Sequence, residues 1–253
     1  MWPPAGGGKP RPYDYAWPVR LFVGTSGFSY KEWKGSFYPE DLPASGMLAY
    51  YAARLSAVEI NNTFYRMPRE QMLAQWASQV PEDFVFVLKA SQRITHQKRL
   101  KEAGDSVDYF FRTAAALGPR LGPVLFQLPP NLKKDLPRLE AFLAILPEGA
   151  RGAFEFRHAS WFEDDVFEAL RARGQALCLA EDEELATPAV ATAGWGYARL
   201  RRQDYGPEDL RRRAEIYRSQ PWQELYVFFK HEEGGTGPVL ARNFREVFGN
   251  ANG

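Results

Sequence analysis

The chain has 253 residues, a net charge of +1, and is 45% hydrophobic and 25% charged, which is close to the average for soluble globular proteins. This composition excludes intrinsic disorder for most of the chain. The near-neutral charge excludes a strong global attraction to nucleic acid or to an anionic membrane. The single cysteine, Cys178, excludes a disulfide framework and a cysteine-rich metal site.

The first 19 residues are rich in proline and glycine and contain no apolar stretch followed by a small-residue cleavage site. They therefore predict an irregular tail and not a secretory signal. We expect this tail (1–19), a single barrel domain (20–249) and a short C-terminal tail (250–253). The apolar runs are too short to cross a bilayer, so we expect a cytoplasmic protein with no membrane partner.

Short runs rich in β-branched and aromatic residues recur between Gly, Pro and polar residues. The predicted strands are 21–25, 57–61, 84–89, 123–127, 153–157, 176–181, 196–200 and 225–230. Apolar residues recur at helical spacing between many of them, as at Leu73, Trp76, Ala77 and Val80. The runs 124–128 and 226–229 are largely apolar without alternation, which is typical of strands buried on both faces of a parallel sheet.

Eight such strand–helix units predict an α/β fold, a single TIM (β/α)8 barrel with long loops after its strands. A doubly wound open sheet is the alternative. That fold usually carries a glycine-rich phosphate turn after its first strand, whereas this chain has the different sequence GTSGFSY there.

Polar residues follow the predicted strands, where the reacting groups of such barrels lie. In chain order they include Thr25, Ser26, Tyr30, Glu59, Asn61, Lys89, His96, Gln127, Glu155, Arg157, His158, Glu181, Asp182, Arg199, Arg201, Lys230 and His231. Buried charges need partners or a wet pocket. The strand-end charges therefore form either a mutually neutralising structural network or a functional site, and the sequence leaves both interpretations open.

Several motifs in the right order resemble the YecE-like family, also called domain of unknown function 72. They are VGTSGFSYKEWKGSFYPEDLP (23–43), VEINNTFYRMP (58–68), FVLKASQRITH (86–96), FQLPP (126–130), FEFRHASWF (154–162) and YARLR (197–201). The resemblance covers roughly residues 20–249 and implies a TIM barrel, but it implies no established reaction.

Two departures from the family pattern add positive charge. The seventh strand of the family usually continues from its arginine into His-Gly, where this chain has Leu200, Arg201 and Arg202. The eighth typically ends in Asn-Asn, where this chain has Lys230 and His231. The ligand of this chain is therefore expected to be bound differently from that of typical members.

The main hypothesis is a pocket for a small anionic or phosphate-containing molecule, with hydrolysis by acid–base chemistry as an extension. Arginine forks suit phosphate and carboxylate groups. The expected catalytic residues are Glu155, Glu181 and His158. The expected ligand-binding residues are Thr25, Ser26, Tyr30, Glu59, Asn61, Lys89, Gln127, Arg157, Arg199, Arg201 and Lys230.

The glycine-rich stretch at residues 234–237 precedes the last predicted helix, where barrels often hold phosphate on backbone N–H groups. Glu232 and Glu233 beside it argue against an anion. A flexible loop and helix start is the simpler interpretation.

Two alternatives use other chemistry. A metal-dependent hydrolase would draw on His96, His158, His231, Glu59, Glu155, Glu181 and Asp182, but none of these residues has a diagnostic metal spacing. We therefore predict no metal and no cofactor. A non-enzymatic nucleic-acid-binding barrel would stack bases on the aromatics among 30–34 and 64–66. Near-neutral net charge makes nucleic acid the less favoured partner.

Overall fold

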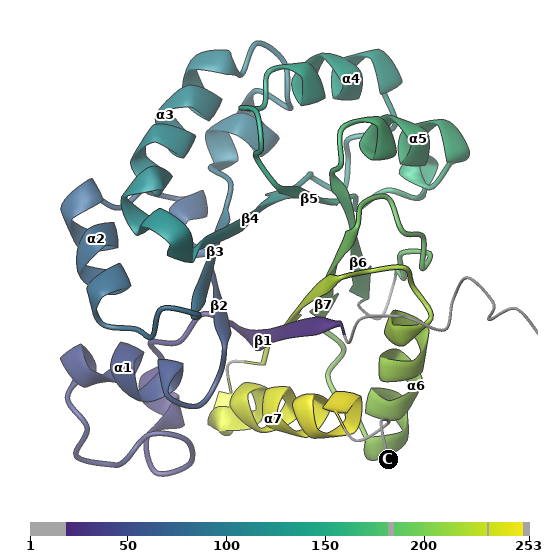
Figure 1. The fold of residues 1–253 in the computed structure, drawn as a ribbon. Coiled ribbons are helices and arrows are strands. Elements are labelled where there is room, and N and C mark those ends of the chain that lie inside the picture. The colour runs from purple at the N-terminus through teal and green to yellow at the C-terminus, as the bar shows by residue number, and fades with distance from the viewer. Residues whose placement is uncertain (1–18, 182–184, 232, 250–253) are drawn as a thin grey trace, which may run out of the picture.

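The computed structural model describes residues 19–181, 185–231 and 233–249. Its strands are β1 (Arg20–Ser26), β2 (Ala57–Ile60), β3 (Val85–Lys89), β4 (Leu121–Gln127), β5 (Gly152–Glu155), β6 (Ala176–Glu181), β7 (Trp195–Leu200) and β8 (Glu224–Phe229). They are parallel and close into a barrel in sequence order, with β8 pairing back to β1. The predicted TIM barrel is confirmed (Figure 1).

The helices surround the barrel (Figure 1). They are α1 (Met47–Ala52), α2 (Glu70–Ser78), α3 (Gly104–Ala114), α4 (Leu136–Ala144), α5 (Asp164–Ala172), α6 (Pro207–Arg218) and α7 (Thr236–Gly249). The predicted stripe from Leu73 to Val80 lies on α2 and just beyond it. The β6–β7 connection forms no α-helix over 185–194, where the sequence carries no apolar stripe at helical spacing.

Alternation along the strands divides the apolar core into two layers. One set of side chains fills the inside of the barrel, and the larger set packs between the strands and the helices. On β6, for example, Ala176 and Cys178 belong to the inner set, whereas Leu177 and Leu179 belong to the outer one.

The N-terminal end of the barrel is filled by stacked side chains. The rings of Phe22 and Tyr226 stack with centroids 4.7 Å apart, and Trp195 meets Tyr226 edge-on at 6.1 Å. Arg151 lies over the Trp195 ring and forms an ion pair with Glu224 at 2.6 Å. Phe22, Tyr226 and Trp195 are all buried, so aromatic rings close this end of the barrel.

Candidate functional site: a charged cluster at the barrel mouth

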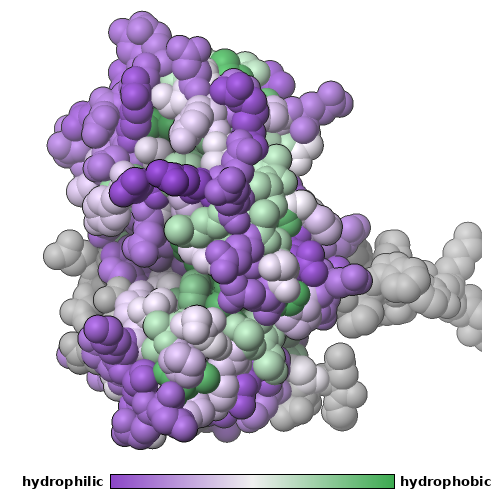
Figure 2. Space-filling model, turned by 90° about the vertical axis from the view of Figure 1, so that its left-hand side faces the viewer, coloured by the Kyte–Doolittle hydropathy of each residue, from purple (hydrophilic) through white to green (hydrophobic). Residues whose placement is uncertain are grey.

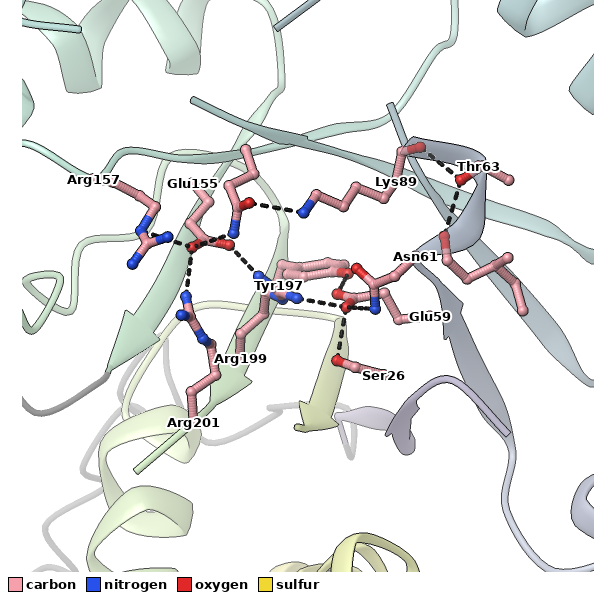
Figure 3. A network of polar contacts seen from close by, with 12 residues as sticks. Ser26, Glu59, Asn61, Thr63, Lys89, Glu155, Arg157, Tyr197, Arg199 and Arg201 are labelled. Carbon is pink, nitrogen blue, oxygen red and sulfur yellow. Dashed lines mark hydrogen bonds and ion pairs between the residues drawn. The ribbon is translucent and has the colours of Figure 1, made fainter. Parts of the chain in front are cut away.

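Arg199 occupies the centre of the barrel mouth (Figure 3). It extends inward from β7 with only 2% of its side chain exposed. One guanidinium nitrogen lies 2.5 Å from a Glu155 oxygen, and the other lies 2.8 Å from Glu59. These buried charges are therefore compensated by direct ion pairs, as burial requires.

Glu59, on β2, accepts hydrogen bonds from three further side chains. Ser26 donates at 2.7 Å, the Asn61 amide at 3.1 Å and the Tyr197 hydroxyl at 2.6 Å. Burial opposes ionisation, but Arg199 and these hydrogen bonds outweigh it and hold the pKa of Glu59 below its usual value. Glu59 is therefore an ionised acceptor whose oxygens are fully engaged.

Glu155, on β5, is held in the same way. It accepts from Gln127 at 2.8 Å and from Arg201 at 3.0 Å, and Arg157 lies 4.0 Å away. Burial opposes ionisation here too, but Arg199, Arg201 and these hydrogen bonds lower the pKa of Glu155 to about 2. A carboxylate so strongly stabilised in its charged form takes up protons poorly near neutral pH.

Lys89, at the end of β3, is the lysine of the cluster whose pKa is lowered. Its ammonium donates to Gln127 at 2.7 Å and lies 4.3 Å from the centre of the Phe64 ring. Burial, together with the charges of Arg199 and Lys230, lowers the pKa of Lys89 to about 8. This amine therefore exchanges its proton much closer to neutrality than an ordinary lysine does.

Lys230 and Arg201, which replace residues of the family pattern, both lie at this mouth. Lys230 directly follows β8, is exposed, and forms no side-chain hydrogen bond or ion pair with the described residues. The other two replacements meet each other, because His231 Nε2 lies 2.7 Å from the carbonyl oxygen of Arg202. The residues expected to depart from the family pattern therefore follow two neighbouring strands, β7 and β8.

Four predicted site residues are engaged elsewhere. Thr25 points to the opposite face of β1, where its hydroxyl lies 2.8 Å from that of Tyr51. The Tyr30 hydroxyl donates to the backbone oxygen of Ser26 at 2.6 Å. Glu181 follows the outward register of β6 and forms an ion pair with Arg213 on α6. His158 accepts from the Ser160 backbone N–H at 3.2 Å and so caps a short helical turn.

The other two histidines also lie apart from the ion-pair centre. The His96 ring packs edge-on against Phe64, and burial together with the Lys89 charge lowers the pKa of His96. His231 packs against Tyr205. Within the described ranges, no three His, Cys, Asp or Glu side chains gather in a way that could hold a metal ion. Asp182, named among the metal candidates, lies outside the described residues.

The glycine-rich stretch begins α7 and is tightly packed at two positions. Gly235 has φ +75°, and a Cβ there would lie 2.4 Å from the Ser36 hydroxyl. A Cβ on Gly237 would lie 2.8 Å from the backbone oxygen of His231. Close packing therefore accounts for these two glycines. Glu232 and the side chain of Glu233 are not described.

Tyr197 and Phe64 belong to the cluster but are not among the predicted site residues. Tyr197 lies two residues before Arg199, so strand alternation places both inside the barrel. Phe64 lies in the loop after β2, and its position over Lys89 depends on tertiary packing with no local signal. Over the part of the chain that the structure describes, no helix is long and apolar enough to cross a bilayer.

Comparison with known proteins identifies the family. The family model "Protein of unknown function DUF72" matches residues 22–253. The UPF0759 protein YecE of Escherichia coli K12 is 34% identical over 128 residues, which are 50% of this chain and 47% of that protein. The UPF0759 protein YunF of Bacillus subtilis is 26% identical over 184 residues, 68% of this chain and 64% of YunF. The aligned regions thus span about half to two thirds of these curated relatives.

Solved structures agree with this assignment. A DUF72 family protein (TM1631) from Thermotoga maritima superposes with a TM-score of 0.77 at 29% identity, covering 90% of this chain and 98% of that one. A DUF72 family protein (EF0366) from Enterococcus faecalis, 19% identical, has the same fold with a TM-score of 0.73 and covers 90% and 95% of the two chains. The chain, with its charged barrel mouth, belongs to the DUF72 (YecE-like, UPF0759) family.

Proposed function

We propose that the barrel mouth binds a small anionic molecule through a phosphate or carboxylate group. The observation that carries the proposal is a pair of lysines at the mouth, Lys89 and Lys230, neither of which forms an ion pair with a described carboxylate. Lys89, Arg157, Arg199, Arg201 and Lys230 gather around two carboxylates, Glu59 and Glu155. Both carboxylates already bind Arg199, so an added anion would find the ammonium groups of Lys89 and Lys230, which form no ion pair with a described carboxylate.

The lowered pKa of Lys89 supports the same proposal. Its pKa of about 8 reflects burial near other cations without enough compensating negative charge. An anion beside the ammonium would stabilise the protonated form and raise this pKa. Binding would therefore be strongest below about pH 8 and would weaken as the pH rises and Lys89 loses its proton.

The environments of Glu155 and Lys89 indicate which of them binds the arginines and which of them could transfer a proton. Glu155 binds Arg199 and Arg201 and has a pKa of about 2, which suits an anchor for these arginines better than a general base. Lys89 is the described mouth residue whose pKa is lowered from an ordinary 10.5 to about 8, which is closer to neutral pH. If the site catalyses proton transfer, Lys89 is the group that we propose for it.

The test is thermal unfolding in the presence of inorganic phosphate and a panel of phosphate esters and carboxylates. Chloride at equal ionic strength serves as the reference. We expect at least one of these anions to raise the melting temperature of the wild type, since a ligand of the folded state stabilises it. The increase should be greater at pH 7 than at pH 9, and Lys89→Met and Lys230→Ala should each reduce it.

Arg173→Ala is the matched control, because Arg173 is an exposed arginine at the opposite end of the barrel. This variant should respond to anions as the wild type does. The proposal is wrong if no anion stabilises the protein beyond the chloride reference, or if Arg173→Ala reduces the response as much as the mouth variants do.

A further inference from the structure

A cavity lies beside the barrel mouth, on the side of the molecule that carries α2 and α3, and its lining does not include the charged cluster around Arg199. It has a volume of about 1120 Å³ and includes Tyr65, Arg66, Arg69, Met72, Arg93 and Tyr109 in its lining. Figure 2 views this side and shows apolar surface interrupted by strongly hydrophilic residues. We call this cavity the α2–α3 groove.

Apolar and aromatic side chains are unusually exposed in the α2–α3 groove. Tyr65 is 73% exposed, Tyr109 is 55% exposed and Met72 is 47% exposed. Large hydrophobic residues this exposed are few among the described residues, and these three line one cavity. Such clustering marks an interaction site, whereas single scattered residues do not.

The charges of the groove are also unbalanced. Arg66, Arg69 and Arg93 are exposed, and their guanidinium groups form no hydrogen bond or ion pair with the described residues. Asp105, at the start of α3, is the acidic residue in the described lining. Some surface arginines elsewhere have partners, as Arg112 does in Asp108, but three unpaired arginines gather in this one groove. The groove is therefore complementary to a negatively charged partner.

We propose that the α2–α3 groove binds single-stranded nucleic acid. Exposed tyrosine rings offer faces on which unpaired bases stack, and unpaired arginines attract the phosphates between those bases. The combination of stacking surface and positive charge favours a nucleic acid strand over an acidic peptide, which would use the charges but not the rings. The net charge of +1 adds no global attraction, so the affinity depends on this local surface.

The size of the groove favours a strand over a single nucleotide. Its volume lies at the upper limit of the range of about 300–1,000 Å³ that is typical of small-molecule pockets, and the groove does not end at its own walls. A neighbouring cavity of about 480 Å³ shares Asn62, Met72 and Trp76 with the α2–α3 groove and extends it toward α1. Because the groove residues differ from those of the barrel mouth, this inference does not depend on the proposed anion site.

Fluorescence anisotropy with labelled short oligodeoxythymidylate and oligouridylate tests the proposal at low salt. Tyr65→Ala and Tyr109→Ala should each weaken binding about tenfold, since each removes a stacking surface. Tyr65→Phe keeps the ring and should bind like the wild type. Arg93→Ala should reduce the slope of log affinity against log salt by about 0.7, the value for one lost phosphate contact on a single strand.

Arg212→Ala, at an exposed position on α6, is the charge-matched control and should leave binding unchanged. The proposal is overturned if neither oligonucleotide binds, or if Lys89→Met abolishes binding while Tyr65→Ala does not. It is also overturned if thymidine monophosphate binds as tightly as the strand, or if polyglutamate competes equally well. Binding of either DNA or RNA with the predicted variant pattern supports it.

Discussion

Arg199 is the residue on which the charge balance of the barrel mouth depends, because its guanidinium lies between the buried carboxylates of Glu59 and Glu155. Arg199→Ala would leave both carboxylates without their main partner. We expect the free energy of unfolding to fall by about 3–5 kcal/mol, the usual cost of breaking a buried ion pair from one side. Denaturant unfolding followed by circular dichroism measures this loss.

Arg201→Ala is the comparison, because Arg201 also binds Glu155 but is partly exposed, at 15%. We expect it to cost about 1 kcal/mol, as for ion pairs near the surface. Equal losses in the two variants would show that Arg199 has no special structural role. A stable Arg199→Ala protein would favour a site whose charges serve binding alone.

The ionisation of Glu155 gives the protein a characteristic acid sensitivity. Its pKa is about 2 in the folded protein, against an ordinary value of 4.5. A carboxylate with a lowered folded-state pKa adds stability that is fully present above pH 4.5 and is lost as the pH falls toward 2. The free energy of unfolding of the wild type should therefore decrease across this interval.

Glu155→Gln removes that ionisation. The variant should be less stable than the wild type at neutral pH, and the difference should shrink as the pH falls toward 2. Unfolding by urea at a series of pH values measures both proteins, and Glu140→Gln, exposed on α4, is the control. A difference between wild type and Glu155→Gln that stays constant with pH would contradict the assignment.

The sequence identified most residues of the cluster, because acids, amides and bases at the ends of parallel strands converge on one end of a barrel. The prediction from sequence was less successful at deciding which strand-end side chains point into the barrel and which point toward the helices. Glu181 continues the outward register of Leu177 and Leu179, so alternation alone argues for its contact with α6. The pairing of Tyr197 with Glu59 joins residues 138 positions apart, and no local pattern predicts it.

At the scale of elements, Gly24 allows β1 and β2 to approach each other closely. A Cβ at this position would lie 1.8 Å from the backbone oxygen of Ala57 and 2.8 Å from the Tyr51 hydroxyl. Backbone atoms of a neighbouring strand cannot move aside cheaply. We expect Gly24→Ala to lower the free energy of unfolding by about 3 kcal/mol, as severe overpacking does.

Gly194→Ala is the matched control, because a Cβ there meets nothing within 4 Å. Its stability should stay within about 0.5 kcal/mol of the wild type. Urea unfolding of both variants gives the comparison. A mild effect of Gly24→Ala would show that β1 and β2 can separate locally without disturbing the barrel.

The helical elements were predicted where an apolar stripe exists and missed where it does not. Short α1 has no long stripe, and its Tyr51 instead bonds to Thr25 and to the backbone of Ala57. The connection from β6 to β7 is the opposite case, because it has no apolar stripe and forms no α-helix over 185–194. Periodicity predicts amphipathic helices well, but it cannot detect segments held by specific tertiary hydrogen bonds.

At the scale of the whole molecule, the order and direction of the strands followed from the alternation of strands and helices. Closure of β8 against β1 joins the two ends of the described chain, and the sequence predicted it only through the number of strands. The register between strands decides which side chains meet at the mouth. Because it arises from packing of the complete barrel, no single segment specifies it.

The stack of Phe22, Tyr226 and Trp195 determines by which end of the barrel a small molecule can enter and leave. Since these buried rings fill the far end, the described residues leave no passage along the axis. A molecule held beside Lys89 has to leave by the way it came. On the proposal that anions bind at Lys89, two anions would therefore compete for this one ammonium group, because neither could pass the other along the axis.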